Sequence, residues 1–208
     1  MEINRYQCGV YVGKVMGKSR DYIPAECKKL VYDWYQLKEI AKNFKDESSF
    51  FDWSFIIVPM SKAIEGILIS LAKDLGLDKE DNIVGNFFDT PNIEKNFQNI
   101  EEKIIEKGLS SKQKEDIKGQ LAELKNFLKR YRHVPSHYGS FFKSYEQAEA
   151  AGISGLHNIG CVLNELLQAG VVSIPESEIL KLEDDEIPTL NLDDLESEKE
   201  VRLEDIPF

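Results

Sequence analysis

Apolar residues recur every three or four positions along most of the chain, which is the period of an amphipathic α-helix. Pro24 is a good first helical residue, and Ser110 or Ser111 can cap a helix start. Gly76, Gly108 and Gly170 stand where helices would end. The pattern therefore predicts five helices, over residues 24–44, 49–75, 91–106, 111–131 and 145–169.

The second predicted helix is apolar on most of its sides, which indicates a place at the centre of the core. Pro59 lies inside it and should kink or split it, because proline cannot donate the helical hydrogen bond. The fifth helix carries small residues that permit close packing between helices. The fold class expected is all-α, a bundle of about five helices.

The two ends of the chain have a different composition from the middle. Residues 3–15 are rich in valine, tyrosine and glycine with short-range alternation, which predicts one or two short strands or an extended arm. The chain is thus divided into an extended segment (1–23), a helical domain (24–172) and an acidic tail (173–208). The tail is expected to be disordered or to fold on a partner.

The net charge of −11 is concentrated in this tail. Residues 174–208 hold 13 acidic and three basic side chains, a net charge of −10, which leaves −1 for the rest. Residues 111–143 hold eight basic and three acidic side chains, a net charge of +5. Such a basic band is expected of a phosphate-binding surface, although a solvated helix face has the same composition.

Cysteine usage and hydropathy indicate a cytoplasmic protein. The three cysteines are scattered at positions 8, 27 and 161, so they form neither a disulfide framework nor a zinc motif. The densest apolar run, over residues 50–60, contains Asp52 and is too short to cross a bilayer. We therefore expect no membrane association and no metal cofactor.

An arginine and a histidine stand five positions apart in the sequence Arg132-His133-Val134-Pro135-Ser136-His137. Arginine holds a phosphate with a planar set of donors, and histidine exchanges protons near neutral pH. Together they can bind a phosphodiester and assist its cleavage by the ribose 2′-hydroxyl, a nucleophile that RNA has and DNA lacks. This chemistry requires no metal.

A helical domain with Arg-x4-His between its last two long helices resembles the HEPN superfamily of nucleases. Three further segments are similar to the C-terminal toxic domain of the RNase LS toxin family, and the similarity extends over about residues 24–172. These segments are Lys62-Ala63-Ile64-Glu65-Gly66-Ile67-Leu68, Leu75-Gly76-Leu77 and Gly85-Asn86-Phe87-Phe88-Asp89.

The resemblance implies a metal-independent endoribonuclease that leaves 2′,3′-cyclic phosphate and 5′-hydroxyl ends, acts in toxin–antitoxin or anti-phage defence, and forms a homodimer. His137 would be the general acid or base, and Arg132 would stabilise the transition-state charge. Glu65 would orient one of the two, and Lys62 would contact phosphate. The expected substrate-binding residues also include Arg130, His133 and Tyr138, of which Tyr138 could stack on a base.

Each of these residues also has a structural interpretation. Arg132 and His137 could cap a helix end and a turn, and Lys62 and Glu65 could be a surface pair. His133 and His137 form an HxxxH pattern, but Pro135 between them disfavours a helical zinc site. His157 is expected to be a packed or surface histidine.

At the level of function, a non-catalytic RNA-binding, nucleotide-binding or protein-interaction module is the alternative, with the acidic tail recruiting an antitoxin or a larger complex. In a third hypothesis the tail covers the basic band and damps a nuclease.

Overall fold

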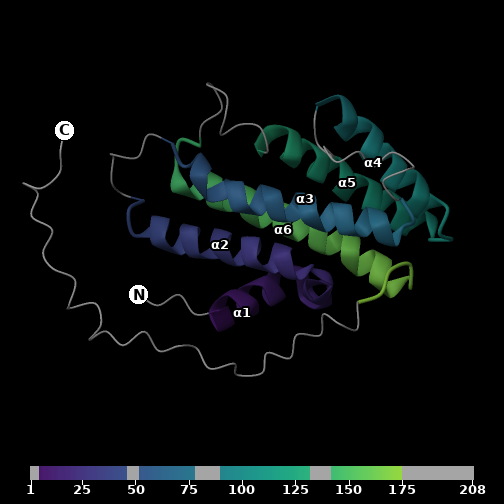
Figure 1. Ribbon diagram of the computed structural model, residues 1–208, viewed down its shortest axis with the longest axis horizontal. Helices are drawn as coiled ribbons and strands as arrows, with labels where there is room; N and C mark the ends of the chain where they lie inside the picture. Colours follow the sequence, from purple (N-terminus) through teal and green to yellow (C-terminus); the bar gives the residue numbers. More distant parts are fainter. Residues whose placement is uncertain (1–4, 46–51, 78–89, 132–141, 175–208) are drawn as a thin grey trace, which may run out of the picture.

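Six α-helices and two short 3₁₀ helices (η) make up the part of the chain that the structure, a computed structural model, describes: residues 5–45, 52–77, 90–131 and 142–174 (Figure 1). Within these ranges there is no strand, so the all-α class is confirmed. The elements are α1 (Arg5–Met16), η1 (Gly17–Tyr22), α2 (Ala25–Lys42), η2 (Ser54–Ile56), α3 (Ile57–Asp74), α4 (Thr90–Ile105), α5 (Ser111–Tyr131) and α6 (Tyr145–Gln168).

Helices α3 and α6 lie side by side at the centre of the bundle (Figure 1). Helix α2 packs mainly on α3, α5 packs on both central helices, and α4 packs on the outside of α5. At one end of the bundle, α5 finishes while α3 and α6 begin (Figure 1). The backbone N–H of Trp53, just before α3, donates a hydrogen bond of 3.1 Å to the carbonyl of Phe142, just before α6. Tyr131 and Phe142, the described residues on either side of the Arg-x4-His sequence, lie at this end.

Glycines on α6 bring its neighbours close to its backbone, as the sequence pattern predicted. A Cβ atom added to Gly152 would lie 2.5 Å from the indole Nε1 of Trp34 on α2. At Gly155 it would lie 2.7 Å from Ile64 on α3 and 2.8 Å from Phe127 on α5. Helix α6 is therefore the element on which α2, α3 and α5 all pack.

The predicted strands at the amino terminus are wrong for the described residues, because residues 5–16 form α1. Cys8, Val12 and Met16 are buried at intervals of four, so the helical period decides the conformation although valine and glycine are weak helix formers. Helix α1 packs on α6, and the Asn164 amide donates to the Met16 carbonyl at 2.8 Å. The segment is part of the bundle rather than an extended arm.

The second predicted helix begins later than expected, and Pro59 does not interrupt it. The α-helix starts at Ile57, so Pro59 is its third residue, where a backbone N–H has no partner within the helix. The end was predicted correctly. Gly76 has a φ of +80°, and the N–H groups of Leu77 and Gly76 donate to the carbonyls of Ala72 and Lys73, as in a Schellman cap.

The other predicted boundaries agree with α2, α4, α5 and α6 to within about two residues, the usual uncertainty of a helix end. The segment Ser54–Asp74, which includes α3, is long and apolar enough to cross a membrane by length and composition. Of the most apolar 18-residue window in this segment, 56% is buried inside the structure. The core helix of a globular protein has the same length and composition. The acidic tail lies outside the described residues from position 175 onward.

Candidate functional site

Four of the predicted site residues, Arg132, His133, His137 and Tyr138, lie outside the described residues. The segments on either side of them are described. Tyr131 is the last residue of α5, and Phe142 is the first described residue after the gap. Their rings stack with centroids 5.0 Å apart and planes inclined by 26°. The two ends of the segment that carries the Arg-x4-His sequence are therefore held together.

These ends are also fixed to the rest of the bundle. The ring of Tyr131 meets that of Phe127 edge-on at 5.0 Å, one turn earlier on α5. The ring of Tyr145, in the first turn of α6, meets Trp53 edge-on at 6.0 Å. Ser144 caps α6 by accepting a hydrogen bond from the N–H of Gln147. The described residues on either side of 132–141 are thus packed against the bundle next to the start of α3.

Lys62 and Glu65 lie three residues apart on α3, as predicted; the side chain of Lys62 is exposed and that of Glu65 is half-buried. Ile64, beside Glu65 in the chain, points to the junction where Phe127 and Gly155 meet. Since Phe127 in turn contacts Tyr131, the turn of α3 that carries Ile64 and Glu65 lies close to the last two turns of α5. The predicted contact of Glu65 with Arg132 or His137 lies outside the described residues.

Arg130 is exposed in the last turn of α5, with its guanidinium carbon 5.4 Å from the centroid of the Tyr131 ring. It is the one predicted substrate-binding residue next to the motif that the structure describes. A guanidinium on a ring face is a stabilising cation–π contact and leaves its N–H donors available to a phosphate.

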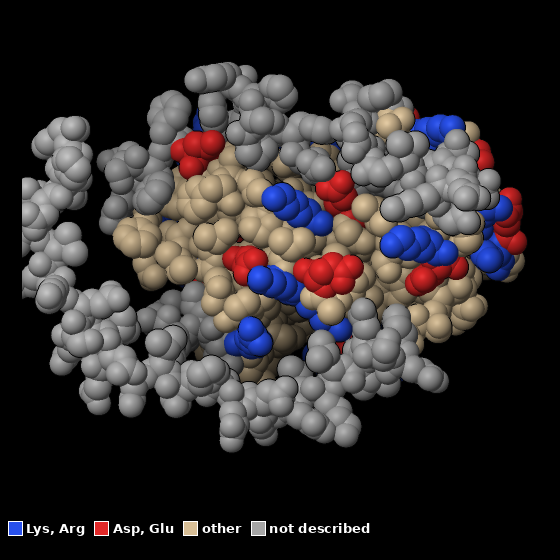
Figure 2. Space-filling model, in the orientation of Figure 1, with Lys and Arg blue, Asp and Glu red and all other residues tan. Residues whose placement is uncertain are grey.

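Some basic side chains of the band at residues 111–143 form ion pairs that join two helices. Lys125 and Lys129 of α5 both pair with Glu94 of α4, and Lys118 pairs with Glu101 at 3.0 Å. Hydrogen bonds from Lys125 and Lys129 lower the pKa of Glu94 to about 2. Three of the eight basic side chains therefore hold α4 against α5. The face in Figure 2 shows acidic and basic side chains side by side rather than a region of one sign.

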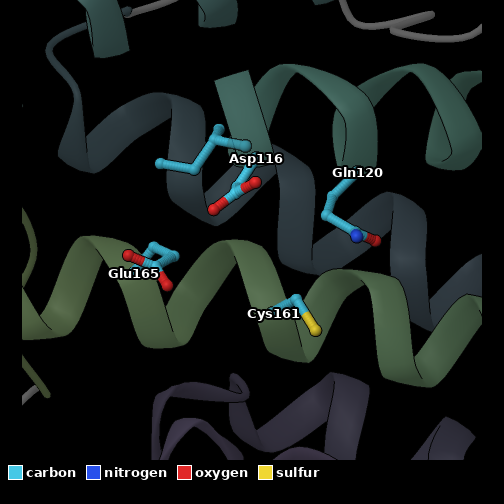
Figure 3. A pocket seen from close by; sticks show the side chains of 5 residues that line it. Asp116, Gln120, Cys161 and Glu165 are labelled. Carbon is cyan, nitrogen blue, oxygen red and sulfur yellow. The ribbon is translucent and has the colours of Figure 1, made fainter. Parts of the chain in front are cut away.

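A shallow hollow lies between α5 and α6, lined by Asp116, Ile117, Gln120, Cys161 and Glu165 (Figure 3). Burial, followed by the charge of Glu165, raises the pKa of the Cys161 thiol, which keeps it protonated at neutral pH. The imidazole Nε2 of His157 lies 3.5 Å from its Sγ. Two carboxylates would repel a phosphodiester, so this hollow does not suit RNA cleavage.

Sequence reasoning missed a buried polar cluster around Lys38. The Lys38 side chain is 3% exposed and pairs with Glu39 and, at 3.4 Å, with Glu149 of α6. Its ammonium lies 4.7 Å from the ring centroids of both Tyr11 and Tyr35. Burial and the charges of Glu149 and Glu39 raise the pKa of Tyr11 to about 12.

A signal for this cluster was present in the sequence. Lys38 falls four residues after Trp34 and three before Ala41, so it occupies a position of the apolar stripe of α2. A charged side chain there requires partners from the facing helices. Its surroundings are aromatic rings of α1 and α2 and a carboxylate of α6, which favours a structural role in joining these three helices.

In the part of the chain that the structure describes, no three His, Cys, Asp or Glu side chains are grouped to hold a metal ion. The HxxxH pair of the motif lies outside that part. Comparisons of the whole chain with protein-family models, with curated proteins and with solved structures found no match. The likeness to HEPN nucleases therefore depends on the sequence segments quoted above.

Proposed function

We propose that this chain is a metal-independent endoribonuclease of HEPN type. The observation that carries the proposal is the sequence Arg132-x4-His137 between α5 and α6, whose flanking residues Tyr131 and Phe142 stack at one end of an all-helical bundle. An exposed arginine, Arg130, adds a phosphate-binding group beside it. The order of the similar segments along the chain supports the same reaction.

In this proposal His137 accepts the proton of a ribose 2′-hydroxyl while the oxygen attacks the adjacent phosphorus. The bond from phosphorus to the 5′-oxygen breaks, and a protonated histidine, His137 or its counterpart in a second subunit, gives a proton to that oxygen. Arg132 stabilises the additional negative charge on the phosphoryl oxygens. The products are a 2′,3′-cyclic phosphate and a 5′-hydroxyl.

The role of Glu65 in this scheme is to orient Arg132 or His137, and Lys62 would contact a neighbouring phosphate. A homodimer would bring two motifs into one cleft. The biological setting that fits such an activity is toxin–antitoxin or anti-phage defence in the cytoplasm, with an antitoxin or a larger complex as partner.

The test is incubation of the purified chain with total cellular RNA in EDTA, beside an Arg132→Ala/His137→Ala double variant. A His157→Ala variant is the matched control, because His157 is an exposed histidine in the middle of α6. We expect cleavage by the wild type and the control, with cyclic-phosphate ends, and none by the double variant.

Other results separate the alternatives. If none of the three proteins cleaves RNA but the wild type binds it, the result supports the non-catalytic binding module. If the double variant cleaves as fast as the wild type, the motif is not the active site. Circular dichroism of all three proteins would show whether the substitutions leave the helical content unchanged.

A further inference from the structure

The hollow between α5 and α6 brings polar side chains of two helices together. Asp116 and Gln120 lie one turn apart on α5, and Cys161 and Glu165 lie one turn apart on α6. Their side chains line the gap between the helices together with the buried Ile117, which is apolar (Figure 3). The cavity volume is about 220 Å³, smaller than the ~300–1,000 Å³ of sites for drug-sized ligands. The hollow therefore suits a molecule with only a few carbon atoms.

The two carboxylates of the hollow have no cationic partner within the described residues. The side chains of Asp116 and Glu165 form no hydrogen bond or ion pair there. Lys118, two residues after Asp116, pairs instead with Glu101 of α4 at 3.0 Å. Glu165 is half-buried, so its carboxylate loses part of its hydration without gaining a charge partner. Both carboxylates are therefore available to a cation that binds from outside the chain.

Gln120 gives a second, independent indication of a ligand. Its side-chain oxygen Oε1 is buried and accepts no hydrogen bond from the described residues. The side chain is part of the lining of the hollow, on the α5 side (Figure 3). Buried acceptors in folded proteins nearly always have a donor, because an unsatisfied one is unfavourable. The group that fits beside this oxygen is an N–H donor, and the two carboxylates favour one with a positive charge.

An alkylammonium group fits this lining better than a metal ion. The described residues contain no group of three His, Cys, Asp or Glu side chains that could hold a metal. Burial, followed by the charge of Glu165, raises the pKa of the Cys161 thiol, so it is not a metal-binding thiolate at neutral pH. An ammonium group carries three N–H donors with its charge, and methylene groups pack on apolar surface such as Ile117. Because the carboxylates come from two facing helices, a diamine can place one ammonium group at each.

We propose that the hollow between α5 and α6 is a binding site for a short aliphatic diamine or polyamine. One ammonium group pairs with Asp116 and donates a hydrogen bond to Oε1 of Gln120. The second ammonium group pairs with Glu165, and the methylene groups between them lie on Ile117. The inference uses none of the residues of the proposed nuclease site, so either proposal can fail without the other.

The alternative is that the hollow holds only water, and that polyamines gather on the protein because its net charge is −11. A site-specific measurement separates the two cases. The isotope-labelled full chain is titrated with putrescine and with cadaverine at constant ionic strength, and its backbone amide signals are followed by NMR. Butylamine, which has one ammonium group, and Mg²⁺, which has no N–H donor, are the comparison cations.

Two variants that each remove one negative charge form a matched pair. Glu165→Gln removes a carboxylate of the hollow. Glu123→Gln removes an exposed carboxylate of α5 that does not line it. General attraction of cations to the acidic chain is the same in both variants. Gln120→Leu is a third variant, which replaces the unsatisfied acceptor with an apolar group of similar size.

We expect the amide signals of the residues that line the hollow to shift together and to saturate with either diamine. Butylamine should bind about two- to fivefold more weakly, which is the contribution of one partly exposed ion pair. This advantage of the diamine should disappear in Glu165→Gln and persist in Glu123→Gln. Gln120→Leu should weaken the binding of diamine and monoamine alike, and that result stands even if Glu165→Gln does not fold.

Shifts that spread over acidic residues throughout the chain and do not saturate would overturn the site. An equal diamine advantage in Glu165→Gln and Glu123→Gln would do the same. If Mg²⁺ binds at the same residues as tightly as putrescine, the hollow is a site for divalent charge rather than for a diamine. If a lysine-containing peptide binds there more tightly than either diamine, the hollow takes a protein side chain, and the small-molecule proposal is wrong.

Discussion

The indole of Trp34 occupies the space that a side chain at Gly152 would need: a Cβ there would lie 2.5 Å from Nε1 and 2.7 Å from two ring carbons. Trp34 is fully buried, so the ring cannot move aside into solvent. Gly152→Ala should therefore lower the free energy of unfolding by about 1–3 kcal/mol, as overpacking does. Urea unfolding monitored by circular dichroism measures it.

Gly119 on α5 is the control for this prediction. It is exposed, and a Cβ there meets nothing within 4 Å. Gly119→Ala should raise the free energy of unfolding by about 0.5–1 kcal/mol, because alanine loses less backbone entropy in a helix. Equal effects of the two substitutions would show that helices α2 and α6 are not packed as closely as described.

Lys38 is expected to stabilise the fold through both its charged ammonium group and the packing of its methylene groups. Lys38→Ala would leave a hole among Tyr11, Tyr35 and Trp34 and take the partner from Glu149, at a cost of about 2–4 kcal/mol. Lys38→Met should cost less, since it keeps the stem packed and both carboxylates are partly exposed to water.

Lys42→Ala, at an exposed position one turn further along α2, should change the free energy of unfolding by less than about 0.5 kcal/mol. Thermal unfolding at pH 7 compares the three variants. A Lys38→Ala protein as stable as Lys42→Ala would mean that the cluster contributes nothing.

Glu94 gives a pH dependence to the α4–α5 contact. Its pKa is lowered from an ordinary value near 4.5 to about 2, first by the hydrogen bonds of Lys125 and Lys129. A lowered folded-state pKa contributes stability above the unfolded-state pKa, and that contribution is lost as the pH falls from about 4.5 through about 2. The free energy of unfolding of Glu94→Gln should thus lie below that of the wild type at pH 7.

The difference between the two proteins should shrink as the pH falls through this window and vanish near its lower limit. Added salt should also reduce it at pH 7, because all three side chains reach solvent. Unfolding curves at several pH values between 2 and 7 measure the difference. A difference that does not vary with pH would contradict the assignment.

The acidic tail is expected to restrain the proposed nuclease. Residues 174–208 carry a net charge of −10 and residues 111–143 one of +5, and electrostatic attraction between them is strongest at low salt. A chain ending at residue 173 should cleave RNA faster than the full chain in low salt, and the two rates should converge in high salt. Equal rates at both salt concentrations would remove this hypothesis.

Some helix boundaries of this chain follow from local sequence, and others depend on tertiary packing. The ends of α3 and α6 were predictable because Gly76 and Gly170 adopt the positive φ that a helix cap requires. Residues 5–16 were misread because alternating valines suggested a strand, while the four-residue spacing of Cys8, Val12 and Met16 is the period that packing on α6 selects. The composition of residues 5–16 alone gives no information about their packing on α6.

The polar cluster was missed for a related reason. Lys38 lies on the apolar stripe of α2, but its partner Glu149 is 111 residues away, and only the folded bundle brings them together. The end of α5 at Tyr131 and the start of α6 at Tyr145, on either side of the Arg-x4-His sequence, were predicted correctly from helix periodicity. The arrangement of Arg132 and His137 toward Glu65 stays a prediction.

The stack of Tyr131 on Phe142 separates two kinds of selection on this chain. The two rings and the hydrogen bond from Trp53 to Phe142 fix where residues 132–141 leave and re-enter the bundle. Tyr131 and Phe142 are therefore selected for holding the helices together, whereas the proposed chemistry would select Arg132 and His137 between them.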